Sequence, residues 1–142
     1  MENSPTCPAW LPVVALALHD GEGRWLMHRR PAGKQHGGLW EFPGGKVEMA
    51  EIPSLALIRE AAEELGIVVA AADLVPVGFA DGGLLKSASS VVLFLYECCK
   101  WQGTPDPLEG GRLAWCALDE IERLPMPPLD QVLFRQLAQK HA

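Results

Sequence analysis

The segment from residue 44 to residue 67 constrains the fold more than any other, because it marks both ends of one helix. Pro53 suits a first helical turn, where the N–H that proline lacks would have no partner. Gly66 suits the position just after a helix. The sequence therefore predicts a helix over 53–65. Its expected apolar face consists of residues that recur at three- and four-residue steps: Leu55, Ile58, Ala62 and Leu65.

Apolar runs on both sides of this helix predict the remaining elements. Strands are indicated by VVALALHDGEGRWLMHRR, which holds two of them, and by LVPVGFA, SSVVLFLYECC and RLAWCAL. LWEFP indicates a short strand that Pro43 ends, after which Gly44 and Gly45 are expected to open a loop. LDEIERL predicts a helical turn, and DQVLFRQLAQKH predicts a C-terminal helix. The order of strands, helix, strands and helix predicts an α+β fold with a sheet between helices.

Size and composition suit one globular domain over 1–142, with a flexible tail expected at 1–9. The net charge of −6 argues against binding to a nucleic-acid polymer or to an anionic membrane surface. The first residues lack the pattern of a signal peptide, and the apolar runs are too short to cross a bilayer. The four cysteines have no CxxC spacing, so we expect reduced thiols in a cytoplasmic protein.

Three glutamates crowd onto the predicted helix. Glu60, Glu63 and Glu64 have i, i+3, i+4 spacing, which places their Cβ atoms about 5–6 Å apart on one face. Like charges this close repel, and Arg59 is the helix's only cation. One interpretation is a solvated acidic face. The other is a site for Mg²⁺ or Mn²⁺, which prefer carboxylate oxygens. The neighbouring glycine pair and the basic residues between 24 and 46 favour a metal-dependent phosphate-ester site.

The same segment resembles the Nudix box. Residues 45–67 match each fixed position of that pattern, namely Gly45, Glu51, Arg59-Glu60, Glu63-Glu64, Gly66 and an aliphatic residue at 67. Ala61 is smaller than the apolar residue usual at its position, which affects packing. RRPAGKQHGGLWEFPGGK, WQGTP, LEGG and MPPLD are similar, in this order, to segments of MutT-type enzymes within the family. The resemblance covers roughly residues 11–138.

This resemblance implies a Nudix fold, an α/β/α sandwich around a mixed β-sheet. It also implies an enzyme that hydrolyses a nucleoside diphosphate linked to another group, with Mg²⁺ or Mn²⁺. Arg59 would orient the glutamates, and Glu51 would pair with it or join the outer shell. Glu109 would reach the metal from a loop; the alternative is an exposed loop acid. The other implied metal-binding and base groups are the Gly44 carbonyl, Glu60, Glu63 and Glu64.

In MutT-type enzymes the β-phosphorus of a nucleoside triphosphate is attacked, and the products are a monophosphate and pyrophosphate. Arg30 and Lys46 are candidates for contacts to the phosphates or sugar; for Arg30 the alternative is a solvated charge at a strand end. Asp130 matches the position of a base-reading side chain, although asparagine is common there. An ionised aspartate only accepts hydrogen bonds, which fits guanine first and cytosine second. The alternative is an N-cap for the C-terminal helix.

Three functional hypotheses remain open at this stage. The first is a Mg²⁺-dependent hydrolase of an oxidised purine nucleotide such as 8-oxo-dGTP, which would remove damaged nucleotides from the nucleotide pool. The second has the same chemistry on CTP or a damaged pyrimidine nucleotide. The third is a non-catalytic Nudix-fold domain that binds nucleotides, against which the intact set of glutamates argues. In each case the expected partner is a small nucleotide, and the protein is expected to be a monomer or homodimer.

Overall fold

Seven strands and two long helices build the fold in the computed structural model, which describes residues 10–85 and 90–142. The tail expected at 1–9 lies outside these residues. β1 (Leu11–Leu18) is an inner strand of the larger sheet, whose order is β4-β1-β6-β5. It pairs in parallel with β6 (Val91–Cys98) and antiparallel with β4 (Gly44–Lys46). β5 (Val75–Asp81) pairs antiparallel with β6, so the sheet is mixed, as expected.

A second sheet, of order β3-β2-β7, is antiparallel throughout. It consists of β2 (Arg24–Arg29), β3 (Trp40–Glu41) and β7 (Arg112–Ala117). His19, the residue after β1, forms an isolated bridge with Trp25 of β2. Beyond this bridge β1 and β2 belong to different sheets. The expected strands are therefore divided between two sheets. The short elements are α2 (Leu118–Ile121) and two 3₁₀ turns, η1 (Ala71–Asp73) and η2 (Gly82–Leu85).

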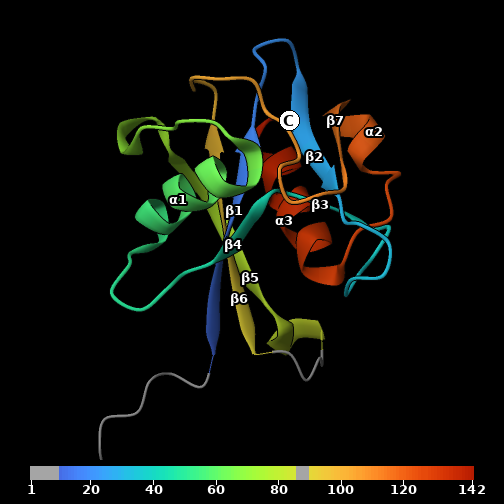
Figure 1. The fold of residues 1–142 in the computed structure, drawn as a ribbon. Helices are drawn as coiled ribbons and strands as arrows, with labels where there is room; N and C mark the ends of the chain where they lie inside the picture. Colours follow the sequence, from blue (N-terminus) through green and yellow to red (C-terminus); the bar gives the residue numbers. More distant parts are fainter. Residues whose placement is uncertain (1–9, 86–89) are drawn as a thin grey trace, which may run out of the picture.

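The helices α1 (Pro53–Leu65) and α3 (Pro128–Lys140) lie on opposite sides of the larger sheet (Figure 1). Alternate residues of β1 pack into two separate hydrophobic clusters, one on each face of the sheet. Ala15 and Ala17 pack in the cluster that contains α3 residues, whereas the intervening positions pack with α1 residues. A strand covered on both faces is apolar at successive positions, which explains its continuous apolar run. The expected α/β/α layering is confirmed.

The ends of α1 are those that the sequence predicted. The helix begins at Pro53, and Gly66 ends it in the left-handed conformation at φ 71°. The expected apolar face was partly wrong, because the side chain of Leu55 is 52% exposed and Ala62 is also exposed. The face toward the sheet is turned so that it also includes carboxylates. Its buried residues are Ala56, Leu57, Ala61, Glu64 and Leu65.

Gly44 and Gly45 form strand β4 rather than the expected loop. Gly44 pairs with Ala15, and Gly45 pairs with Val14. A Cβ atom at position 44 would overlap the carbonyl oxygen of Val14, so the strand requires glycine there to approach β1. Close packing of two backbones, not a turn, explains this residue.

Two further expectations concern the whole chain. Within residues 10–85 and 90–142, no helix combines the length and apolar character that crossing a membrane requires. The three cysteines in this part, Cys98, Cys99 and Cys116, are free thiols.

We predict that Gly44→Ala lowers the free energy of unfolding by about 2 kcal/mol or more, because its Cβ forces β4 away from β1. Urea denaturation measures the change. Gly45→Ala is the matched comparison: its Cβ would meet the Glu60 carboxyl group, a side chain that can move. Its loss of stability should be smaller, and equal losses would contradict the explanation.

Candidate active site

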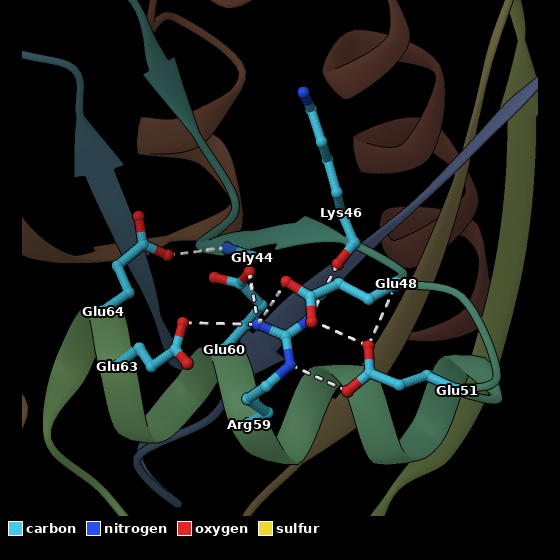
Figure 2. Close-up of polar contacts among 8 residues, drawn as sticks. All are labelled: Gly44, Lys46, Glu48, Glu51, Arg59, Glu60, Glu63 and Glu64. Atoms are coloured by element: carbon cyan, nitrogen blue, oxygen red, sulfur yellow. Dashed lines mark hydrogen bonds and ion pairs between the residues drawn. The ribbon is translucent and has the colours of Figure 1, made fainter.

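Arg59 holds the loop before α1 against the helix (Figure 2). Its Nε and Nη2 donate to the two oxygens of Glu51, at 2.7 and 2.9 Å. Nη2 also donates to the carbonyl of Lys46 at 2.9 Å, while Nη1 reaches Glu60 at 3.1 Å and Glu63 at 3.3 Å. The hydrogen bonds from Arg59 lower the pKa of Glu51 to about 2. One guanidinium thus compensates several of the crowded negative charges, and Glu51 pairs with it as expected.

The three helix glutamates are not equivalent. Glu64 is buried and points to β4, where its Oε1 accepts a hydrogen bond from the N–H of Gly44 at 2.8 Å (Figure 2). The Glu60 carboxyl group lies against Gly45, where any Cβ would overlap it. Burial raises the pKa of both Glu60 and Glu64. The side chain of Glu63, in contrast, is 53% exposed and contacts Arg59.

Strand β2 places His28 next to Glu64 of α1, and the side chain of His28 is buried. Its Nδ1 is 3.3 Å from Glu41 Oε2 and 3.9 Å from Glu64 Oε2. Its Nε2 is 2.9 Å from the carbonyl oxygen of Gly110. The hydrogen bond with Glu41 raises the pKa of His28, and Glu41 also accepts a hydrogen bond from Arg30 at 3.1 Å. Histidine and two carboxylates therefore form one buried polar cluster.

Sequence reasoning missed His28 and Glu41 as members of the site. The sequence did hold a signal for His28. It is two positions from Leu26 on a strand, so the two side chains lie on the same face of the sheet. Leu26 packs in the core on the α1 side. A histidine on that face is placed toward the helix glutamates, but this follows only once β2 is known to lie beside α1.

The carboxylates fit a divalent cation. Glu60 and Glu64 are turned inward together, and burial makes their charged forms costly, so a nearby cation would stabilise them. Their oxygens are the hard ligands that Mg²⁺ and Mn²⁺ prefer. His28, Glu41 and Glu64 also each offer a ligand atom, all within 4.8 Å of one another. The N–H of Gly44 donates to Glu64, and the carbonyl of Gly44 remains a predicted metal ligand.

A cavity of about 790 Å³ adjoins these groups. Its size is in the range of small-molecule sites. Besides carboxylates, its lining includes Lys34 and His36 from the loop after β2. Lys46 extends from β4 away from the Arg59 cluster (Figure 2). Seven of the predicted site residues line the cavity: Arg30, Gly44, Lys46, Glu60, Glu64, Glu109 and Asp130. Glu51, Arg59 and Glu63 are not among the described residues of its lining.

Asp130 is not the N-cap of the C-terminal helix. Helix α3 begins at Pro128 and its N-cap is Pro127, so Asp130 lies in the first turn. Its carboxyl group is buried, and Oδ2 accepts a hydrogen bond from the N–H of Phe42 at 3.1 Å. Burial raises the pKa of Asp130 to about 7. The N-cap interpretation was wrong because the two prolines start the helix before Asp130.

Comparison with known proteins agrees with the fold. The NUDIX domain matches residues 10–137, and the chain belongs to the NUDIX family. Hydrolases of this family act on small nucleotide substrates and generally use a divalent metal.

Two relatives and one solved structure are particularly similar. The CTP pyrophosphohydrolase of Escherichia coli is 35% identical over 117 residues, which cover 82% of this chain and 84% of the relative. The 8-oxo-dGTP diphosphatase of Escherichia coli is 30% identical over 130 residues, 89% and 95% of the two chains. The solution structure of the E. coli ORF135 protein matches with a TM-score of 0.80 at 32% identity, over 94% of this chain and 91% of that one.

We predict that Asp130→Asn gains stability relative to the wild type as the pH rises. An unfolded aspartate has a pKa near 3.9, whereas the buried group has a pKa of about 7. The folded wild type therefore holds the proton more tightly, and its stability falls between these two pKa values. From pH 5 to pH 8 the variant should gain about 2 kcal/mol over the wild type in the free energy of unfolding.

Urea denaturation at the two pH values measures this difference. The amide oxygen of the variant can still accept the hydrogen bond from Phe42. Asp119→Asn, which changes an exposed aspartate, is the control. A constant difference between Asp130→Asn and the wild type would show that the folded protein keeps Asp130 ionised at both values.

Proposed function

We propose that the protein hydrolyses a nucleoside triphosphate, with Mg²⁺ or Mn²⁺, to a nucleoside monophosphate and pyrophosphate. The observation that supports this most is that one cavity joins three kinds of group. Carboxylates suit a metal-bound triphosphate, cations suit its remaining charge, and a buried polar side chain suits a base. The cavity is deep enough in the fold for Asp130 of α3 and Glu64 of α1 to line the same space.

The proposed reaction uses the carboxylates in two ways. A divalent cation bound here would neutralise phosphate charge and lower the pKa of water. Glu60, Glu63, Glu64, Glu109 and the Gly44 carbonyl are its proposed ligands. Glu60 and Glu64 are also the candidates for the base that takes the proton from water, because both line the cavity in which the water would be bound.

Arg59 and the cations of the cavity have positioning roles in this proposal. Arg59 holds Glu60 and Glu63 in place through Nη1. Lys46 and Arg30 contact the phosphates or the sugar. Arg30 is part of the cavity wall, which places its guanidinium where a ligand can meet it. Its Nη1 is held by Glu41, which fixes the direction of the side chain.

Asp130 is the proposed contact to the base. Its Oδ2 accepts from the Phe42 N–H, and the residue lines the cavity, where its carboxyl group can meet a ligand. With a pKa of about 7, the carboxyl group is partly ionised at neutral pH. The ionised form accepts from the N1–H and the amino group of guanine. We therefore place an oxidised purine nucleotide such as 8-oxo-dGTP first, and a role in cleansing the nucleotide pool follows from it.

A cytidine nucleotide is the second candidate. The relative that is named CTP pyrophosphohydrolase is 35% identical to this chain and supports it. The protonated form of Asp130 can donate to N3 of cytosine, and the ionised form can accept from its amino group. For either base we place the reaction on free nucleotides in the cytoplasm, with the protein as a monomer or homodimer. The net charge of −6 disfavours a polymer substrate.

The first test is a substrate panel with Mg²⁺ that contains 8-oxo-dGTP, dGTP, CTP, 5-substituted dCTP, ADP-ribose and diadenosine tetraphosphate. We expect kcat/KM for 8-oxo-dGTP to exceed that for dGTP by about a hundredfold, or about 3 kcal/mol. Pyrophosphate release measures the triphosphate reactions. Greater activity on cytidine nucleotides would select the second candidate, and no turnover on the panel would contradict both.

The second test separates an enzyme from a nucleotide-binding domain. Glu64→Gln should lower kcat by about 10²–10⁴-fold, because it removes a proposed ligand and base. It should retain the fold, since a neutral side chain suits this buried position and its amide oxygen can still accept from Gly44. Circular dichroism and urea denaturation check folding. Glu122→Gln, at an exposed position outside the cavity, is the control. Unchanged turnover in Glu64→Gln would reject the proposed site.

A further inference from the structure

The loop that carries Glu109 is attached to α1 by its backbone. The N–H of Asp106 donates to the carbonyl of Leu65, and the N–H of Leu108 donates to the carbonyl of Glu64, both at 3.0 Å. The second of these bonds comes from the residue just before Glu109 and reaches the backbone of a proposed ligand. The backbone that precedes Glu109 is therefore anchored to the end of helix α1 by backbone–backbone hydrogen bonds.

The other side of Glu109 is anchored by His28. The carbonyl of Gly110 accepts a hydrogen bond from Nε2 of His28 at 2.9 Å. The next residue, Gly111, has a φ of 86°, and a Cβ there would overlap the Arg29 carbonyl and lie 2.7 Å from His28 Nε2. Glycine at 111 thus permits the loop to approach the imidazole. Glu109 lies between two anchors, and only the second depends on a side chain.

The contact that Nδ1 of His28 makes with Glu41 fixes the direction of the imidazole. Nδ1 is 3.3 Å from Oε2 of Glu41, whose Oε1 is held by Arg30. Because the ring is buried and bound on both nitrogens, it has little freedom to turn Nε2 away from Gly110.

We propose that His28 is a positioning residue, which holds the backbone of Glu109 so that its carboxylate faces Glu60 and Glu64. Glu109 itself is exposed, and it lines the cavity together with both glutamates. An exposed loop side chain is otherwise free to turn to solvent, and the two anchors restrict the backbone on either side of it. The proposal rests on the proposed function in one respect, namely that Glu109 is a ligand of the metal.

Two substitutions separate the contacts of His28. The amide nitrogen of His28→Gln can take the place of Nε2 and keep the bond to Gly110. His28→Asn is shorter; its amide lies near the position of Nδ1 and cannot reach Gly110. His19→Asn is the matched control, because His19 packs against Trp25 and is absent from the cavity lining that the structure describes.

The first measurement is hydrogen exchange of the metal-free protein. The N–H of Gly110 donates to the carbonyl of Pro107 within the loop, so its exchange reports on loop order. His28→Asn should speed exchange in residues 106–111 by about tenfold or more, with helix α1 unchanged, and His28→Gln should stay near the wild type. Exchange in His28→Asn that equals the wild type would overturn the proposal.

The second measurement is the affinity for Mn²⁺, followed by electron paramagnetic resonance, in a double-mutant cycle with Glu109→Gln. His28→Asn should weaken binding about tenfold in the wild-type background, and His28→Gln should restore most of it. In the Glu109→Gln background His28→Asn should have little further effect, because the residue through which it acts is already changed. Equal losses in both backgrounds would show a general structural role and reject the proposal.

These two measurements need no substrate. If the wild type released no pyrophosphate from any nucleotide on the panel, the proposed function would fail while both results on His28 could still be obtained. Exchange and Mn²⁺ affinity therefore judge the role of His28 separately from the identity of the reaction.

Discussion

The fork of hydrogen bonds from Arg59 is the interaction on which the rest of the site depends. Four glutamates within fourteen residues of chain would repel one another without it. Arg59 binds Glu51 through two nitrogens, which attaches the loop before α1 to the helix, and its remaining donor reaches Glu60 and Glu63. The bidentate geometry needs a guanidinium, since an ammonium group offers no fixed fork. Local attraction thus offsets repulsion and leaves Glu64 free to turn inward.

Glycine at two successive positions allows the backbone of β4 to fit between β1 and α1. At Gly44 the neighbour is the backbone of Val14, and at Gly45 it is the carboxyl group of Glu60. Strand and helix approach so closely that the N–H of Gly44 can bind Glu64 directly. The buried carboxylate is therefore satisfied by the sheet while burial raises its pKa. Fold stability and site geometry share these same contacts.

A polar network connects parts of the site that are distant in the sequence. Glu41 binds both His28 and Arg30, and His28 in turn reaches Gly110 of the loop after β6. In the neighbouring segment the N–H of Phe42 binds Asp130, 88 residues further along the chain. The short segment around β3 thereby connects the side of the cavity lined by Glu60 and Glu64 to the side lined by Asp130.

The sequence by itself determined helix α1, its two ends and the grouping of Arg59 with the glutamates, because these depend on spacing along one helix and on the special backbones of Pro53 and Gly66. Only the tertiary structure decided how the helix is rotated about its axis. Leu55 is exposed, and Glu64 is buried where it accepts a hydrogen bond from the N–H of Gly44. The tertiary structure also decided that Gly44 belongs to a strand, that Asp130 binds Phe42 instead of capping α3, and that His28 lies beside Glu41 and Glu64. Each of these depends on contacts between residues far apart in the chain, and periodicity within one segment carries no information about them.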